Sequence, residues 1–434
     1  MTAPPQALAA TPEDGIDQVT PPRRFVPAMI LTQLGFFTAV TTPLQLLLAL
    51  RLEAIAGSHA TSALGLVTGF GALCALVFNP IAGRVSDRTR NRFGRRRTWI
   101  LTGSALVALA LAAMAAATAV WQVVLLWCLA QAVANFQFAA NNAILADQVA
   151  PERRGRLSGV VGMVAVVGPL SGVALSNAFA PGGPGQWLAI AIASFGVSLV
   201  AVLLFRDPPS TASKPPLDLR ALAETFWFDP RRHPALGWAW LVRFLIMCAY
   251  ASLSYTAFFL MHRIGISEDR VGSAVLEVGV VGAAAMAVAS GVSGYLSDAV
   301  RRQRPFVIFA GLVSAASLVL DSTARGMTVV LVAAALLGLG VGTFLGVDLA
   351  LCVRVLPDAE NFGRDLAIIN IANSLPQSLI PFAAPALLAA GGYPALFLTL
   401  AVLALLGSAA VLRIPEVGRE HEPGRAAPIT RSRG

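Results

Sequence analysis

The sequence predicts an all-α integral membrane protein with about twelve transmembrane helices in two pseudo-symmetric six-helix bundles. Of its 434 residues, 56% are hydrophobic and 13% are charged, whereas soluble proteins carry about 25% charged residues. Apolar runs of roughly 20 residues, long enough for a helix to cross a hydrocarbon core ~30 Å thick, recur along the chain. The segment Gly83-Arg-Val-Ser-Asp87 is repeated as Gly294-Tyr-Leu-Ser-Asp298. This repeat indicates a duplicated membrane domain.

The apolar runs define the expected spans and domains. In chain order, we expect spans at residues 26–50, 61–82, 98–120, 123–147, 157–180, 185–205, 238–261, 272–296, 305–322, 327–352, 365–390 and 393–413. A proline-rich polar stretch separates the first six from the last six. The expected domains are a disordered tail (1–24), a first bundle (25–205), a linker (206–237), a second bundle (238–413) and a second tail (414–434). Asp147–Pro151 resembles Val353–Pro357, so spans 4 and 10 correspond.

Positive charges fall almost entirely on one side of the predicted topology. If both termini are cytoplasmic, the cytoplasmic segments hold 27 of the 32 Lys and Arg residues. The other side holds Arg51, Arg263, Arg270 and Arg325, and the remaining one, Arg243, lies inside a span. This is the positive-inside pattern of a multi-pass protein of the inner (plasma) membrane. Topology therefore explains the net charge of +9, and we expect lipid, not nucleic acid, as the partner of these charges.

Enzymatic chemistry is not indicated by any motif. The four cysteines, Cys74, Cys128, Cys248 and Cys352, all fall in expected spans and lack metal-ligand spacing. The sequence has no nucleophile with a nearby base and no Gly-rich Lys-Ser or Lys-Thr loop for ATP. We therefore expect neither an enzyme nor a bound metal or cofactor. We also expect the protein to be a monomer.

The first repeated motif continues into a cluster of seven arginines between Arg84 and Arg97. Asp87 lies at the end of the second span, where it could contact a helix N-terminus of the other half or an adjacent arginine. Such a contact would hold one side of the protein closed. The alternative is that the cluster sets topology and binds lipid phosphate. The expected gating residues are Gly83, Asp87, Arg88, Gly94, Arg95 and Asp298.

With twelve spans, a central loop and this Gly-x-x-x-Asp-Arg-type motif, the chain resembles the major facilitator superfamily. Ser86–Trp99 and Ala143–Asp147 are similar to motifs of the glycoside-pentoside-hexuronide cation symporters and of plant-type sucrose symporters. The resemblance implies alternating access and a loop that steadies the state closed to the cytoplasm. Those symporters place acidic residues, or an Asp and an Arg, in helices 2 and 4. Here span 2 has no charge before Arg84, and span 4 carries asparagines.

Three ionisable residues stand out inside the expected spans: Arg243, Glu277 and Asp348. A charge at membrane depth costs at least ~2.5 kcal/mol unless it is paired or hydrated, which makes each a functional candidate. Arg243 and Asp348 lie at similar depth and could pair, either as a static bridge or during transport. Glu277, in a poorly solvated position, is the first candidate for the proton-coupling group. The alternative is a protonated structural glutamate or one at a cavity mouth.

Uncharged polar residues in the spans are the candidate lining of a substrate cavity. They are Gln33, Gln45, Gln131, Asn135, Asn142, Tyr250, Tyr255, Asn370 and Asn373. Amides at membrane depth suit a polar solute, but they equally suit hydrogen bonds between helices.

The function expected from these patterns is secondary active transport of a small-molecule substrate. The leading version is proton-coupled symport of a small polar organic solute such as a glycoside. The alternative is a proton-coupled antiporter that exports a drug or natural product. Gly168-Pro-Leu-Ser-Gly172 partly resembles the antiporter motif of drug-exporting facilitators, which favours this alternative.

Overall fold

The computed structural model describes residues 22–149, 151–207, 234–300, 302–355 and 362–414. Most of the expected N-terminal tail (1–24), linker (206–237) and C-terminal tail (414–434) lies outside the described residues. The helices of the two bundles are therefore the parts that can be compared with the expected spans.

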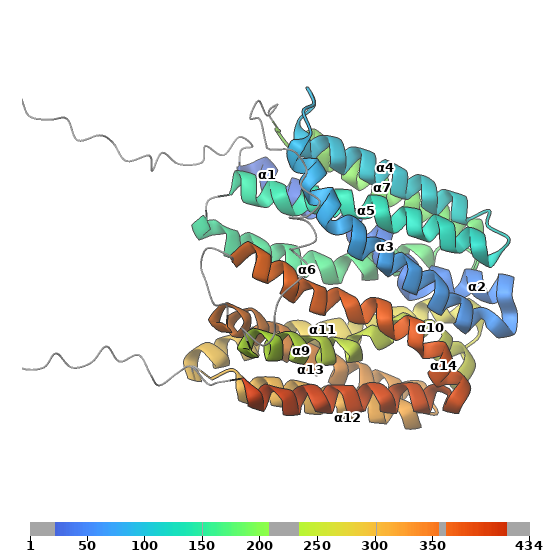
Figure 1. Ribbon diagram of the computed structural model, residues 1–434. Helices are drawn as coiled ribbons and strands as arrows, with labels where there is room; N and C mark the ends of the chain where they lie inside the picture. Colours follow the sequence, from blue (N-terminus) through green and yellow to red (C-terminus); the bar gives the residue numbers. More distant parts are fainter. Residues whose placement is uncertain (1–21, 150, 208–233, 301, 356–361, 415–434) are drawn as a thin grey trace, which may run out of the picture.

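The first half is built from apolar helices joined by short turns (Figure 1). The helices are α1 (Pro22–Thr42), which continues through the π-turn η1 (Pro43–Leu47) into α2 (Leu48–Ala56), then α3 (Ala60–Arg88), α4 (Arg95–Met114), α5 (Val120–Gln148), α6 (Pro151–Ser176) and α7 (Pro184–Leu204). Proline begins several of them, which fits the first helical turn because its backbone needs no N–H donor there.

The second half repeats this arrangement. Its first crossing is composite: α9 (Pro234–Tyr250), η3 (Ala251–Tyr255), α10 (Thr256–Phe259) and the π-turn η4 (Leu260–Ile264). It is followed by α11 (Glu268–Val300), α12 (Arg304–Thr323), α13 (Met327–Val355), α14 (Phe362–Ala410) and η6 (Val411–Arg413).

The described helices make twelve crossings. Ten stretches are long and apolar enough to span a membrane, and two of these contain a reversal. Arg23–Arg88 turns back at the 3-10 turn Gly57–His59. α14 is interrupted at Gly391 and Gly392, and Figure 1 shows the chain reversing there. Gly392 has a φ of +66°, a conformation that favours glycine. The expected twelve-helix fold class is confirmed for this part of the chain.

Small residues allow α11 and α13 to pack closely. Gly338, Gly342 and Gly346 recur every four residues on one face of α13. A Cβ at Gly342 would collide with the backbone of Met286 in α11, and one at Gly346 would come within 2.6 Å of the Ser290 carbonyl oxygen. In membranes, where lipid is as apolar as the side chains, such close backbone contact is a main source of helix association.

We therefore expect Gly342→Val to lower the melting temperature of the purified protein in detergent, because overpacking costs about 1–3 kcal/mol. The matched control is Gly291→Val, since a Cβ at Gly291 meets no described atom within 4 Å. Equal melting temperatures for the two variants would contradict the close packing.

We name the two faces of the protein by their residues. The arginine-rich face carries Arg84–Arg97, and the opposite face carries Glu53, His59 and His262. The first half lies above the second in Figure 1, with α14 beside α3 at their contact.

The two halves approach each other near the opposite face. A Cβ at Gly65 of α3 would come within 2.6 Å of the Pro381 carbonyl oxygen of α14, and one at Gly69 within 2.6 Å of the Phe382 ring. Gly272, in the first turns of α11, lies against Asn177, which follows α6.

The same helix faces are separated near the arginine-rich face. Gly83 lies five turns beyond Gly65 on the same side of α3, and Gly159 lies three turns from Leu170 on the same side of α6. Leu170 contacts Gly279 of the other half, whereas a Cβ at Gly83 or Gly159 would meet no described atom within 4 Å. Within the described residues, the protein is thus closed at the opposite face and open at the arginine-rich face.

Candidate functional site: an apolar cavity with a buried ion pair below it

Arg96 is the centre of a charged cluster on the arginine-rich face. Its side chain is 4% exposed, and its Nη2 lies 2.6 Å from Asp87 Oδ1 while its Nε lies 2.9 Å from Asp147 Oδ2. Nη1 also donates to Ser86 Oγ at 2.9 Å. The neighbouring Arg95 contacts Asp147 at 2.8 Å. The cluster therefore ties α3, α4 and α5 together within the first half.

Gly94 has a structural reason to be glycine. Its φ is +96°, and a Cβ there would collide with Asp207, which follows α7. The Asp207 carboxylate accepts hydrogen bonds from the backbone N–H groups of Arg96 and Arg97 at 2.6 and 3.0 Å. A carboxylate at this place satisfies the first N–H groups of α4 and complements the helix dipole. The loop motif thus docks the end of α7 onto the start of α4.

The other expected gating residues are arranged differently. Arg88 donates to the Arg84 carbonyl oxygen at 3.0 Å. Gly83 lies on the face of α3 that is separated from the second half. Asp298, the counterpart of Asp87 in the repeat, is exposed near the end of α11. The structure therefore brings Asp87, Gly94 and Arg95 together around Arg96 but places Asp298 apart from them.

Arg243 and Asp348 form a buried ion pair. Arg243 Nη1 of α9 lies 2.6 Å from Asp348 Oδ2 of α13, and the two side chains are 13% and 6% exposed. Burial of both charges is costly, so the short distance between them is needed to offset their loss of hydration. The pairing expected from their similar depth is present in the structure.

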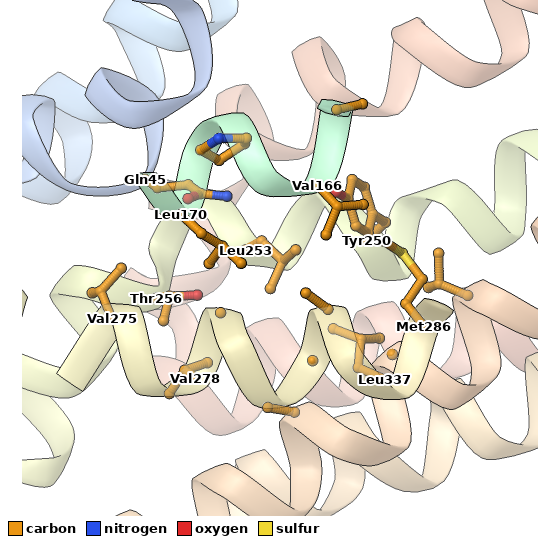
Figure 2. A pocket seen from close by; sticks show the side chains of 18 residues that line it. Gln45, Val166, Leu170, Tyr250, Leu253, Thr256, Val275, Val278, Met286 and Leu337 are labelled. Atoms are coloured by element: carbon orange, nitrogen blue, oxygen red, sulfur yellow. The ribbon is translucent and has the colours of Figure 1, made fainter. Parts of the chain in front are cut away.

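A cavity lies between the two halves, with a free volume of about 760 Å³ including its mouth. Figure 2 shows Gln45 and Leu170 from the first half across from Leu253, Thr256 and Val275 of the second. Only three of its 18 lining residues carry a polar side-chain group: Gln45, Tyr250 and Thr256. The remaining wall is formed by aliphatic side chains, methionine, proline and glycine.

The ion pair lies on the side of this cavity that is nearer the arginine-rich face. Arg243 is seven residues before Tyr250 in α9, and Asp348 is seven residues after Val341 in α13; Tyr250 and Val341 both line the cavity. Seven residues are nearly two helical turns, or about 10 Å of helical rise on the same helix face. The pair is therefore placed between the cavity and the arginine-rich face.

Glu277 is located away from the cavity. Its side chain is exposed, whereas its neighbours Val278 and Gly279 line the cavity from the other side of α11. It shares its exposed side with Val280 and Val288, which are 48% and 66% exposed. This side of α11 is therefore exposed and points away from the cavity between the halves.

Few of the expected cavity residues line this cavity: Gln45 and Tyr250 do so. Asn135 is buried and donates to the Gln131 carbonyl oxygen at 2.8 Å, and Tyr255 donates to the Pro381 carbonyl oxygen at 3.0 Å. Gln33 is fully buried, with no hydrogen-bond partner for its amide among the described residues. Asn142 is exposed, Asn373 is half-buried, and the side chain of Asn370 lies outside the described part. Tyr255 thus makes a hydrogen bond between helices and does not line the cavity.

Three features were missed by reasoning from the sequence. Arg96 could not be distinguished from the other arginines of its cluster. Asp321 lies within an expected span and is half-buried in α12, yet it was overlooked although its position alone could have identified it. His262 comes directly after the expected span 238–261, and the sequence does not show that it lies 3.2 Å from Glu53 of the other half.

Comparisons with known proteins agree with this architecture. The family model described as Major Facilitator Superfamily matches residues 25–320 and 283–432. A search of curated protein sequences finds no match.

Several solved transporter structures have a similar fold. A bacterial homologue of the human lysosomal transporter Spinster, inward-facing and unoccupied, matches with 17% identity and a TM-score of 0.65, covering 91% of this chain and 98% of the other. The human organic anion transporter MFSD10 matches with 19% identity and a TM-score of 0.63, covering 90% and 100%. A mutant of the nucleoside transporter NupG matches with 11% identity and a TM-score of 0.70, covering 89% and 99%. The family match extends over nearly the whole chain, and this protein therefore belongs to the major facilitator superfamily of membrane transporters.

Proposed function

We propose that the protein is a secondary active transporter that works by alternating access and exports an organic solute with a large apolar surface and few hydrogen-bonding groups. The observation that carries this proposal is the lining of the cavity, where 15 of 18 residues offer no polar side-chain group. Ligand sites of this kind hold apolar surface and fix orientation with a few placed polar groups. Gln45, Tyr250 and Thr256 serve that second purpose here.

The apolar lining favours export of a lipophilic compound over import of a glycoside. A glycoside would bring many hydroxyl groups into a site that has three polar side chains, and each unpaired buried hydroxyl or amide costs about 1–3 kcal/mol. Lipophilic compounds enter cells across the bilayer unaided, so energy-driven movement is needed to remove them.

The ion pair Arg243–Asp348 is the best-placed group for proton coupling. It lies between the cavity and the arginine-rich face, which is the open face in this structure. Protonation of Asp348 would remove the negative charge from its 2.6 Å contact with Arg243 and so weaken this link between α9 and α13. Glu277 is less suited to coupling, because it lies on the exposed side of α11, away from the cavity. We therefore assign the coupling role to Asp348.

The distribution of arginine supports the membrane topology that goes with this function. We propose that the arginine-rich face, with both termini, is cytoplasmic and that the membrane is the inner (plasma) membrane. The cavity then opens to the cytoplasm, where a solute for export would bind. The protein works as a monomer, since both halves of the cavity are supplied by one chain.

The test is a binding measurement with a cavity-filling variant. Val341→Trp should lower the affinity for a lipophilic dye such as rhodamine 6G at least about tenfold, because the indole occupies the space that the solute needs. The matched control is Val332→Trp on the same helix, since Val332 is 50% exposed and lies outside the cavity lining. Fluorescence anisotropy of the dye with purified protein gives the affinity.

A flux measurement separates the two transport modes. Liposomes containing the protein and an internal pH dye should show proton movement with rhodamine 6G and none with sucrose. Proton uptake that accompanies sucrose, with no response to the dye, would overturn the proposal in favour of sugar symport.

A further inference from the structure

A small polar cluster joins the two halves at the opposite face. His262 Nε2, in the π-turn η4 of the second half, lies 3.2 Å from Glu53 Oε2, in α2 of the first half. The Tyr393 hydroxyl lies 3.5 Å from His262 Nδ1 on the other side of the ring. Among the ion pairs found between described residues, this pair is the one that crosses between the halves. We call Glu53, His262 and Tyr393 the outer latch.

The elements around the outer latch hold the imidazole in place. The Phe258 ring of α10 stacks on His262, with ring centres 5.4 Å apart and planes at 22°. Tyr393 follows the glycine reversal in α14 and packs against Phe259, with ring centres 5.3 Å apart. Stacking on Phe258 limits the plane of the His262 ring, and within this plane Nε2 faces Glu53 while Nδ1 faces Tyr393.

Protonation would change the bonding of the outer latch. A neutral imidazole has one donor and one acceptor nitrogen, so it can donate to Glu53 and accept from the Tyr393 hydroxyl. An imidazolium has two donors and a positive charge, so its bond to the Glu53 carboxylate becomes a charge-assisted bond, which is stronger. Histidine is the side chain that ordinarily changes charge between about pH 5 and 8. The His262 side chain is 37% exposed, so protons from solution reach it.

The other charged groups near the outer latch come from the elements that pack against it. Arg263 is the neighbour of His262 in η4, and Glu268, Asp269 and Arg270 are at the start of α11, which packs against η4. All four are exposed, where water and salt screen their effects. His59, in the turn after α2, is the other histidine of this face, and Arg51 of α2 donates to the carbonyl oxygens of Ala115 and Ala117. Glu53 is therefore the group in direct contact with the charge of His262.

We propose that the outer latch is a proton-binding switch that holds the opposite face closed when His262 is protonated and loosens as the pH rises. Low pH at this face then favours the state seen here, with the cavity open at the arginine-rich face. The switch follows from the contact between the halves and holds whichever solute the cavity takes.

The test measures opening of the opposite face directly. Spin labels are attached to Ser58→Cys in the first half and Ser267→Cys in the second, both exposed at this face, in a chain whose four native cysteines are replaced by alanine. Double electron–electron resonance in nanodiscs then gives the distance distribution from pH 5 to pH 8. A partly exposed ion pair contributes up to ~1 kcal/mol, so the ratio of long to short distances should rise about fivefold over this range.

Substitutions assign that pH response to the outer latch. His262→Gln and Glu53→Gln should each remove the response, whereas His59→Gln should keep it in full. The exchanged pair Glu53→His with His262→Glu should restore it, because the same two groups again face each other. A pH-independent distribution in the unsubstituted chain, or a full response in His262→Gln, would overturn the proposal.

Opening of the opposite face is measured independently of solute transport. The distance measurement is made without solute, so its result does not depend on which solute the cavity binds.

Discussion

Asp348→Asn should reduce solute flux about tenfold or more, since breaking a buried ion pair by removing one partner costs about 3–5 kcal/mol. The substitution leaves the Arg243 guanidinium, which is 13% exposed, without its carboxylate between α9 and α13. Loss of this contact weakens the link between α9 and α13, and both helices carry residues that line the cavity. Flux into liposomes and the melting temperature of the purified protein measure the two consequences.

The double variant Arg243→Gln with Asp348→Asn distinguishes an effect of the ion pair on stability from an effect on proton coupling. It removes both charges, so the melting temperature should recover most of the loss while proton-driven flux stays low. Asp298→Asn is the matched control, because this aspartate is exposed on the same half. Recovery of full proton-driven flux in the double variant would show that the pair is a static bridge.

Arg96→Ala should be the most damaging substitution on the arginine-rich face. It removes a guanidinium that is 4% exposed and contacts Asp87, Asp147 and Ser86. Asp87 and Asp147 would each lose a charged contact, and the packing that the Arg96 side chain provides between α3, α4 and α5 would be lost as well. We expect loss of most folded protein at 37 °C, measured as the monodisperse fraction after detergent extraction.

Two neighbouring variants test the reason for this loss. Arg95→Ala should lower the melting temperature only slightly, because Arg95 is 20% exposed and contacts one carboxylate. Arg96→Lys should restore little of the folded protein. Lysine carries a point charge and cannot contact several partners at once as the planar guanidinium does. Equal stability of Arg95→Ala and Arg96→Ala would show that charge alone, not the position of Arg96, holds the cluster together.

Much of the fold could be predicted from the sequence because the bilayer imposes a length and a polarity on each span. The expected span 238–261 lies within the crossing formed by α9 to η4, and 98–120 overlaps α4. Helix ends were less accurate, since apolar composition does not show where a helix continues beyond the hydrocarbon core. α3, for example, runs to Arg88, six residues past the expected end.

The site was harder to predict than the fold. The position of a residue within a span indicates its depth in the membrane, but not the direction in which its side chain points. Glu277 and Val278 differ by one residue and lie at the same depth, yet one is exposed and the other lines the cavity. Arg243 and Asp348 could be paired from the sequence because depth alone brings them together. His262 could not be linked to Glu53 from the sequence, because their contact depends on how the two halves pack against each other.

The two copies of the repeated motif now serve different purposes. Ser86 and Ser297 are equivalent and both are buried, but Ser86 receives a hydrogen bond from Arg96 while the Ser297 hydroxyl has no partner among the described residues. The first copy is therefore joined to α4 through Arg96, and the described residues show no such contact at the second copy. A sequence repeat thus preserves the helix while its two copies differ in what they hold together, so a role shown for Asp87 does not carry over to Asp298.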